Sequence, residues 1–283
     1  MSKAKRTSRQ ITRIADISEI CGVAALSKLE LQDEARQTAP EQGCAALFLA
    51  YALLNAESYG LCPSSSQKRI IDISLPITAK TPSWDEPSGV GEFRKLVNTY
   101  EDEMPAAVSE INVGMHTATH VDAPSHFVKH YFDRGLGVEE LDLAVLNGPA
   151  LVVQTPEGTN ITAAVLESLK VPKGVTRILF KTDNSARDLL HKTAFHTDYT
   201  SISADGSAWL VKHTDWKLIG IDYLSVSTYE DNVEGHQIML GKEIIQVEGL
   251  VLKHVEPGQY DLHCLHINVP GADGALARCI LMH

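Results

Sequence analysis

Three histidines and an aspartate lie within one short stretch of the chain, His116-Thr-Ala-Thr-His120-Val-Asp122-Ala-Pro-Ser-His126. Neutral imidazole and carboxylate groups are typical ligands of Zn²⁺, Mn²⁺ or Fe²⁺, whereas Mg²⁺ and Ca²⁺ prefer oxygen ligands almost throughout. The stretch contains no cysteine, which argues for an open site that leaves a coordination position for water or substrate. A lone histidine beside a carboxylate is most often a hydrogen-bonded pair, but four such side chains together favour a metal site.

The spacing of these four residues indicates the local structure that must hold them. All four residue numbers are even, so an extended segment with a side-chain period of two would point them to one face. A helix, at about 100° per residue, would turn Asp122 most of the way round from the histidines, and Pro124 would interrupt it. We therefore expect the four side chains on a strand or an extended loop.

The stretch resembles the signature His-x-Gly-Thr-His-x-Asp-x-Pro-x-His-Phe of the cyclase-like metal-dependent hydrolases, which include bacterial kynurenine formamidase, isatin hydrolase and plant cyclase-like proteins. Further family landmarks follow in order: Ile71-Asp-Ile-Ser74 with Pro82 and Trp84, Gly206-Ser-Ala-Trp-Leu210, Gly220-Ile-Asp-Tyr-Leu-Ser-Val226, and Val247-Glu-Gly-Leu250. The resemblance covers about residues 68–283 and is closest to the plant branch. Ala118 stands where the family has glycine. If the backbone there needs a positive φ, we expect its methyl group to shift the ligand geometry.

The resemblance implies a set of metal ligands. In the family, two ions can lie side by side, the first held by the two leading histidines and the aspartate. The second is held by the same aspartate with a later histidine and glutamate. The corresponding residues here are His116, His120, Asp122, His236 and Glu248. The implied cofactor is therefore one or two Zn²⁺ per chain, with Mn²⁺ as a possible substitute.

The resemblance also implies the roles of two further residues and the reaction. His126 corresponds to the catalytic general acid/base, which suits an imidazole whose unperturbed pKa is about 6.5. Trp84 corresponds to an aromatic residue that packs against substrate, with an ordinary half-buried core aromatic as its alternative. The expected reaction is hydrolysis of an amide, lactam or lactone by metal-activated water.

The substrate is left open between several candidates. An aryl formamide such as N-formylkynurenine is the leading one, because of the family. A cyclic amide such as isatin, or an unsaturated lactone, is the alternative within the enzyme class. The protein could instead belong to a different class, a weakly catalytic metal-binding protein that acts through protein partners. Ala118 favours this hypothesis, whereas the presence of His126 favours an enzyme.

Composition limits the function classes. The chain of 283 residues is 44% hydrophobic and 22% charged, with a formal net charge of −11, which is typical of a soluble globular enzyme. The acidic balance and the lack of a Lys/Arg cluster in the body of the chain argue against nucleic-acid binding. No Gly-x-Ser-x-Gly motif or dinucleotide loop is present. We expect a small-molecule substrate and, from the resemblance, a homodimer or homotetramer.

After residue 68, short β-rich runs alternate with a few helices. Runs of Val, Ile and Leu bounded by turn residues predict strands over residues 69–75, 150–155, 177–182, 218–221, 244–252 and 258–267. Helices are predicted over residues 163–169 and 206–214, with a third over 138–146. The alternation predicts an α/β fold, and the resemblance implies the swivelling β/β/α domain of the cyclase-like hydrolases.

The chain is expected to consist of an N-terminal extension, residues 1–67, and a hydrolase domain, residues 68–283. Residues 2–13 are basic and indicate either a targeting segment or a solvated start. The apolar run over residues 44–56 is shorter than the roughly 20 residues that span a bilayer, and suits a signal-peptide core or a buried helix. The secretory pathway or the extracellular space is the favoured location, with the cytoplasm as the alternative.

Two smaller features of the domain also carry expectations. Cys264 and Cys279 lie in apolar segments near the end of the chain and are expected to be small buried thiols. Asn160-Ile-Thr162 is a glycosylation sequon that matters only in the secretory pathway. Otherwise Asn160 or Thr162 is expected to cap the following helix.

Overall fold

The computed structural model describes residues 69–102 and 104–283. The predictions for the basic segment and the apolar run of the N-terminal extension lie outside the described residues. Within them, no helix is long and apolar enough to cross a membrane.

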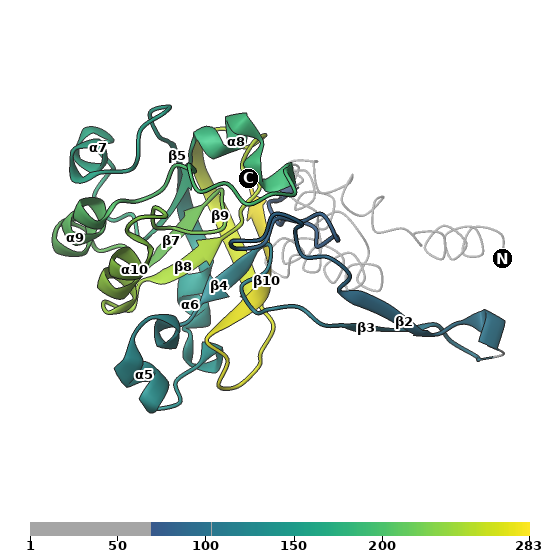
Figure 1. The fold of residues 1–283 in the computed structure, drawn as a ribbon. Helices are drawn as coiled ribbons and strands as arrows, with labels where there is room; N and C mark the ends of the chain where they lie inside the picture. Colours follow the sequence, from purple (N-terminus) through teal and green to yellow (C-terminus); the bar gives the residue numbers. More distant parts are fainter. Residues whose placement is uncertain (1–68, 103) are drawn as a thin grey trace, which may run out of the picture. The chain divides into compact units, whose positions relative to one another are not determined.

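The centre of the described chain is an eight-stranded sheet in which all strands but one form a closed ring (Figure 1). The ring runs β10-β4-β8-β7-β6-β5-β9 and closes where β9 pairs with β10. Its strands are β4 (His120–Asp122), β5 (Asn147–Gln154), β6 (Arg177–Lys181), β7 (Leu218–Ile221), β8 (Ile245–Glu248), β9 (Gly258–His266) and β10 (Gly274–Met282). The remaining strand, β1 (Ile70–Asp72), pairs with the C-terminal end of β10. Strands β5 to β8 run parallel, and the other pairs are antiparallel.

Three helices cover the outer face of β6 and β7: α7 (Ala163–Ser168), α9 (Ala204–His213) and α10 (Asn232–Leu240) (Figure 1). Side chains alternate along a strand, so Ile178 and Phe180 of β6 pack under these helices while Leu179 joins the other core cluster. The Oγ of Thr162 accepts a hydrogen bond from the backbone N–H of Val165, at 3.3 Å, which confirms the predicted cap. The other helices are α5 (Lys129–Asp133), α6 (Leu143–Leu146), α8 (Asp183–Arg187), η1 (Tyr100–Asp102), η2 (Pro124–His126), η3 (Val138–Glu140) and η4 (Leu189–His191).

The same alternation on β4 and β8 separates an apolar face from a polar one. Val121 and Val247 belong to the main hydrophobic cluster, together with side chains of β9 and β10. Their neighbours His120, Asp122 and Glu248 point to the opposite face, where α10 lies. These polar side chains are also buried, so their polar atoms must be hydrogen-bonded, paired with opposite charges or bound to a cation within the protein.

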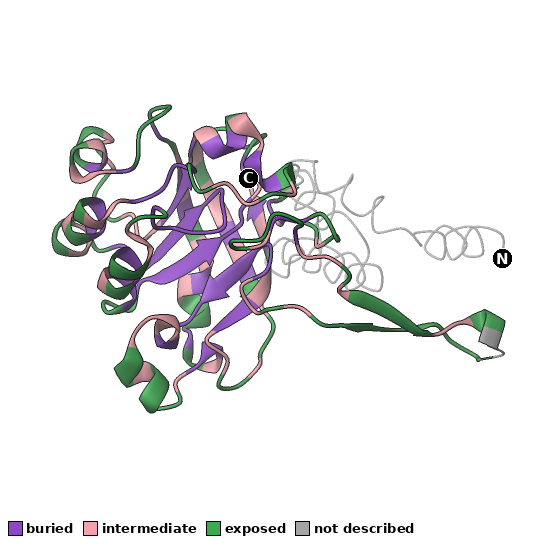
Figure 2. Cartoon of the chain, in the orientation of Figure 1, coloured by how far each residue is buried: buried purple, intermediate pink, exposed green. Residues whose placement is uncertain are grey.

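A two-stranded hairpin lies outside this sheet. It consists of β2 (Arg94–Asn98) and β3 (Val108–Ile111) and extends away from the sheet (Figure 1). Figure 2 shows it exposed along almost its whole length, whereas the central strands are buried.

Most of the predicted elements are present, and the α/β fold is confirmed. The predicted helix over residues 138–146 is wrong, because it is divided into η3 and α6 by an extended Leu141 and Asp142. The Asp142 side chain caps α6 by accepting from the backbone N–H of Ala144 at 2.8 Å. The prediction of buried free thiols is also wrong, because Cys264 and Cys279 are directly opposite in the β9–β10 ladder and form a disulfide.

Candidate metal centre

The histidine-rich stretch is extended only in its middle part. His120 to Asp122 form β4, whereas His116 lies in the preceding turn and His126 ends η2. Ala118 interrupts the extended backbone with a φ of +55°, and Pro124 begins η2. The expectation of one continuous extended face is therefore wrong in detail, although the side chains still converge.

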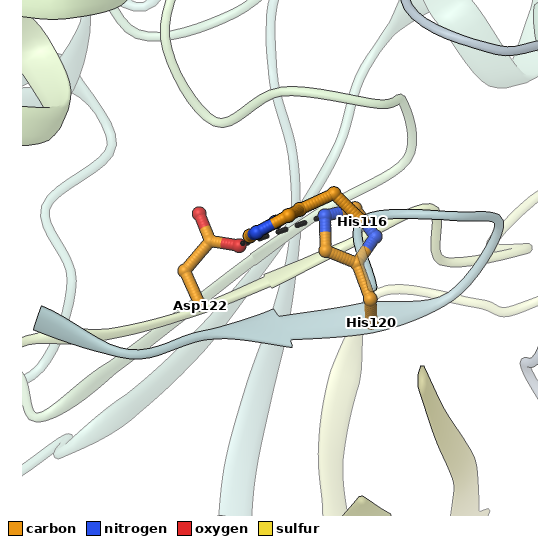
Figure 3. Close-up of side chains that lie close together, drawn as sticks. All are labelled: His116, His120 and Asp122. Atoms are coloured by element: carbon orange, nitrogen blue, oxygen red, sulfur yellow. Dashed lines mark hydrogen bonds and ion pairs between the residues drawn. The ribbon is translucent and has the colours of Figure 1, made fainter. Parts of the chain in front are cut away.

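The structure brings the five predicted ligands into two adjoining groups. One consists of His116, His120 and Asp122, and the other of Asp122, His236 and Glu248. In each group the candidate ligand atoms lie within 4.8 Å of one another, and Asp122 belongs to both. Figure 3 shows the first group, with His120 and Asp122 rising from β4 and His116 reaching Asp122 from the turn.

Sheet register explains how residues so distant in sequence meet. His120 of β4 is directly opposite Glu248 of β8, and their side chains approach to 3.3 Å between Nε2 and Oε2. His236 is provided by α10, which covers this face, and its Nε2 lies 3.2 Å from Glu248 Oε1. Asp122 Oδ2 is 3.7 Å from the same His236 nitrogen.

Backbone carbonyls hold the far side of two of the histidine rings. His120 Nδ1 donates to the carbonyl of Ala118 at 3.0 Å, and His236 Nδ1 donates to that of Asn232 at 2.6 Å. Each ring therefore directs Nε2 into the cluster as a lone-pair donor, the arrangement found in metal-bound histidines.

The cluster passes a direct test of whether it fits a metal. His120 Nε2 and Asp122 Oδ2 are buried and have no hydrogen-bond partner among the described residues. Leaving such groups unpaired in the interior costs about 1–3 kcal/mol each, and more when charged. A divalent cation among these donors would satisfy both atoms. All five side chains offer an imidazole or a carboxylate, and the three side chains of the second group are all buried.

Ala118 occupies the left-handed region that the family glycine would favour. Its side chain is buried, and its carbonyl is the one that holds His120. Gly249 packs so closely against it that a Cβ at Gly249 would lie 2.1 Å from the Ala118 oxygen. Ala118 therefore adopts the positive φ although it is not glycine, and this backbone conformation costs about 1–2 kcal/mol.

Charges in the cluster shift the pKa values of its members. Burial lowers the pKa of His116, but the carboxylates of Asp122 and Asp273 outweigh it and raise the pKa to about 10. Burial raises the pKa of Asp122, but His116 outweighs it and leaves the carboxyl pKa below its ordinary value. Burial lowers the pKa of His126, which favours a neutral ring able to accept a proton.

Sequence reasoning missed two residues beside the site, Asp273 and Gly274. Asp273 Oδ2 lies 3.0 Å from His116 Nε2 and 3.1 Å from His126 Nδ1. A Cβ at Gly274 would lie 2.3 Å from the His116 ring, so this position must be glycine for the ring to fit. No sequence signal links these residues to the motif, because about 150 residues separate them and only the β4–β10 pairing brings them together.

A pocket of about 280 Å³ opens onto the centre. Its lining combines the cluster with aromatic and small polar side chains: Trp84, His116, His120, His126, Phe127, Leu224, Ser225, Asn232, His236 and Glu248. Trp84 is 37% exposed and stacks on Tyr229, with ring centroids 5.8 Å apart. Phe127 stacks on His236 at 4.3 Å. The pocket therefore offers aromatic faces near the candidate metal ligands.

Four matches to known proteins cover all or part of the described domain. The Cyclase family model matches residues 71–228. Cyclase-like protein 3 of Oryza sativa subsp. japonica is 47% identical over 215 residues, 76% of this chain and 80% of the rice protein. Kynurenine formamidase of Bacillus cereus is 30% identical over 213 residues, 75% of this chain and 96% of the bacterial protein. A solved structure of a potential metal-dependent hydrolase with cyclase activity is 27% identical, covers 76% of this chain and 98% of its own, and has a TM-score of 0.62.

Proposed function

The chain belongs to the Cyclase family, and we propose that it is a metal-dependent hydrolase that cleaves an aryl formamide, such as N-formylkynurenine. The observation that carries the proposal is the pair of histidine–carboxylate groups that share Asp122 and open, beside His126, into one pocket. The proposed ligands are His116, His120 and Asp122 for one Zn²⁺ and Asp122, His236 and Glu248 for a second. Mn²⁺ is the alternative metal.

Divalent cations held by these residues would lower the pKa of water towards about 7 and polarise the scissile carbonyl. His126 accepts the proton that the attacking water loses and returns it to the departing nitrogen. The water oxygen bonds to the formyl carbon, the C–N bond breaks, and the products are an arylamine and formic acid, which ionises to formate by releasing the second water proton to solvent. Proton transfer of this kind typically contributes about 10² to 10⁴ in rate.

The aromatic lining supports an aryl substrate. Trp84 and Phe127 line the same pocket as the candidate ligands, and Tyr229 stacks behind Trp84. An aromatic ring placed against such faces gains about 0.5–1.5 kcal/mol beyond its buried area. The similarity to the bacterial kynurenine formamidase points to the same substrate class.

Two alternatives remain as competing proposals. A cyclic amide or lactone would use the same cations and His126, with the leaving group still joined to the acyl group after ring opening. A weakly catalytic metal-binding protein would keep the cluster without turnover. Ala118 was the feature that favoured this second alternative, but its backbone holds His120 as described above.

The first experiment combines metal content with a substrate panel. Purified wild-type protein should contain one to two Zn²⁺ or Mn²⁺ per chain by inductively coupled plasma mass spectrometry. The Asp122→Ala protein should contain no bound metal. Metal-loaded protein is then assayed on N-formylkynurenine, isatin and an unsaturated lactone. Turnover of the formamide alone supports the proposal, and turnover of only the cyclic compounds moves the assignment to the first alternative. Bound metal without any turnover supports the metal-binding protein.

A second variant separates metal binding from proton transfer. His126→Ala should keep the wild-type metal content and lose about 10² to 10⁴ in kcat. His254→Ala, which removes a histidine that belongs to none of the metal groups of the described residues, is the matched control. An His126→Ala protein with full activity would exclude the proposed role of the imidazole.

We also propose that the active protein is a homodimer or homotetramer in which the β2–β3 hairpin contacts a second copy. An isolated hairpin is at best marginally stable in water. This one exposes apolar side chains along both strands: Leu96 48%, Val97 38%, Val108 44% and Ile111 60%. Replacing Leu96 and Ile111 by serine should lower the molar mass measured by light scattering, and an unchanged mass would remove the hairpin from the interface.

The division into an extension, residues 1–67, and a hydrolase domain, residues 68–283, remains a proposal. The similarities to the rice and bacterial proteins, each over about 215 residues, support it. The protein expressed from residue 68 should retain metal and activity, whereas loss of both would place the extension in the working enzyme.

A further inference from the structure

Asp273 joins two residues that have different parts in the proposed reaction. Its Oδ2 lies 3.0 Å from Nε2 of His116, a proposed ligand, and 3.1 Å from Nδ1 of His126, the proposed acid/base. The two imidazole rings stack at 3.8 Å with 20° between their planes. One carboxylate oxygen thus faces two parallel rings.

The fold fixes the place of this carboxylate. Asp273 directly precedes β10, whose first residue, Gly274, is opposite Asp122 in the β10–β4 ladder. The backbone carbonyl of Asp273 accepts a hydrogen bond from the N–H of Ala123 at 2.9 Å. The backbone at this point is therefore tied to the strand that carries the proposed ligands.

The hydrogen bonds determine which ring nitrogens carry protons. A carboxylate oxygen has two lone pairs, so it accepts from both His116 Nε2 and His126 Nδ1. His116 is then left with Nδ1, 2.9 Å from Asp122 Oδ1, as the nitrogen that faces the metal group. For His126, proton transfer falls to Nε2.

We propose that Asp273 is a positioning residue of the proposed hydrolysis, with one oxygen that orients both the metal ligand His116 and the acid/base His126. This inference rests on the proposed function. A carboxylate behind a metal-bound histidine fixes the ring and makes it a better donor, and losing such a partner typically costs about 10- to 100-fold in metal affinity or activity.

The same three side chains also qualify as a third metal group, with ligand atoms within 4.8 Å. Used in that way, His116 would have to give up both ring protons to serve two cations at once. A hydrogen-bonded carboxylate needs no such deprotonation, and the two distances of about 3 Å are ordinary N–H···O lengths. The positioning role is therefore the one that the geometry favours.

The test uses Asp273→Asn and Asp273→Ala in the full chain, with Asp72→Asn as the matched control. Asp72 is also a carboxylate beside β10, but it binds Arg278 and is remote from the cluster. Zn²⁺ affinity is measured by competition with a chromophoric chelator. We expect the two Asp273 variants to bind one Zn²⁺ about 10-fold or more weakly, and Asp72→Asn to bind as wild type does. Unchanged Zn²⁺ affinity in both Asp273 variants would overturn the link to His116. A metal count reduced by one, with unchanged Zn²⁺ affinity of the remaining sites, would assign Asp273 to a third metal instead.

Catalysis gives the second readout. With a formamide that the wild-type protein hydrolyses as substrate, the kcat of Asp273→Ala should be about 10- to 100-fold lower than that of wild type. Its KM should stay within about twofold of the wild-type value. Because 45% of the Asp273 side chain is exposed, added formate should reach the vacated position and restore part of kcat in this variant while not raising that of wild type. If Asp273→Ala lost activity only because its structure was disturbed, added formate would not restore its kcat. A wild-type kcat in Asp273→Ala that formate leaves unchanged would overturn the link to His126.

Nitrogen-15 spectra of histidine-labelled protein keep this test independent of the proposed function. The His126 signal, identified by its loss in His126→Ala, should show a proton on Nδ1 in wild type and a changed proton distribution in Asp273→Ala. If no substrate is turned over while this change is seen, the proposed function fails and the positioning contact stands. An unchanged spectrum in Asp273→Ala rejects the contact, whatever the activity.

Discussion

Two antiparallel ladders in this chain, β4–β8 and β2–β3, carry charged side chains in opposite surroundings. Every residue of β4 and β8 is buried, and β10 and β7 flank the pair. Nearly every residue of β2 and β3 is exposed, and no third strand lies beside them among the described residues. Glu248 in the first ladder is 3% exposed, whereas Glu110 in the second lies in solvent.

The difference shows what each ladder needs in addition to its own hydrogen bonds. Buried carboxylates and imidazoles lose their hydration, and this cost is offset only when each charge is paired or binds a cation. The hairpin has no such cost, but it also buries too little apolar surface to be stable by itself. We therefore expect the β4–β8 ladder to depend on metal and the β2–β3 hairpin to depend on a second protein surface.

The largest difference between the ladders should come from glutamate replacements. Glu248→Ala removes a proposed ligand, leaves His120 and His236 without their shared partner, and frees the N–H of Val226 that Glu248 accepts at 2.8 Å. We expect the loss of at least one metal, about 10³-fold in kcat/KM, and about 3–5 kcal/mol of stability in the metal-free protein. Glu110→Ala should change none of these quantities. Metal analysis, kinetics and urea unfolding compare the two variants, and equal effects would refute the contrast.

Glycine replacements should give the next largest difference. At Gly274 a new Cβ would lie 2.3–2.9 Å from three atoms of the His116 ring, so Gly274→Ala should push this ring out of the first metal group. We expect about 10- to 100-fold lower activity and weaker binding of one metal. At Gly91, before the hairpin, a Cβ meets nothing within 4 Å. Because its φ is +72°, Gly91→Ala should cost about 1–2 kcal/mol and leave metal binding unchanged. Full metal binding by Gly274→Ala would show that His116 is not a required ligand.

The buried ladder is also where sequence and structure agree best. Residue types alone indicated a metal site in the stretch from His116 to His126, because so many imidazoles and a carboxylate rarely gather without a shared task. His236 and Glu248 came only from the family resemblance, since α10 was not predicted. Its Gly235 is unfavourable in a helix, and the reason for it is tertiary: a Cβ there would meet Ser227 Oγ at 2.4 Å.

What the sequence could not indicate depends on pairing between distant strands. Asp273 lies beside His126 only because β10 pairs with β4, and Cys264 meets Cys279 only through the β9–β10 register. The spacing of residues along the chain indicates neither of these two strand registers. The break of the extended stretch at Ala118 could not be predicted from the residue types alone, because alanine seldom adopts a positive φ; only the family glycine at this position pointed to it.

Metal removal should have a smaller effect, confined to the buried ladder. A ligand that binds only the folded protein at 100 times its Kd adds about 2.7 kcal/mol, which corresponds to about 5–10 °C in Tm for a domain of this size. We expect a chelator to lower the Tm of wild type by this amount in differential scanning fluorimetry, and to lower that of Leu96→Ser equally. A hairpin variant whose Tm no longer responds to the chelator would show that the two ladders are coupled.

The smallest expected effect is at Ala118, and it tests how much the buried ladder tolerates. Ala118→Gly relieves about 1–2 kcal/mol of backbone strain at a φ of +55°, but it removes a buried methyl group worth about 0.8 kcal/mol that packs with Leu75 and Tyr223. The free energy of unfolding should therefore change by less than about 1.5 kcal/mol, with unchanged metal content. Urea unfolding and metal analysis of the loaded protein measure both quantities. If the glycine variant instead binds more metal or turns substrate over at least about 10-fold faster, Ala118 impairs the centre through the Ala118 carbonyl that holds His120, and the weakly catalytic metal-binding protein becomes the better description of the natural chain.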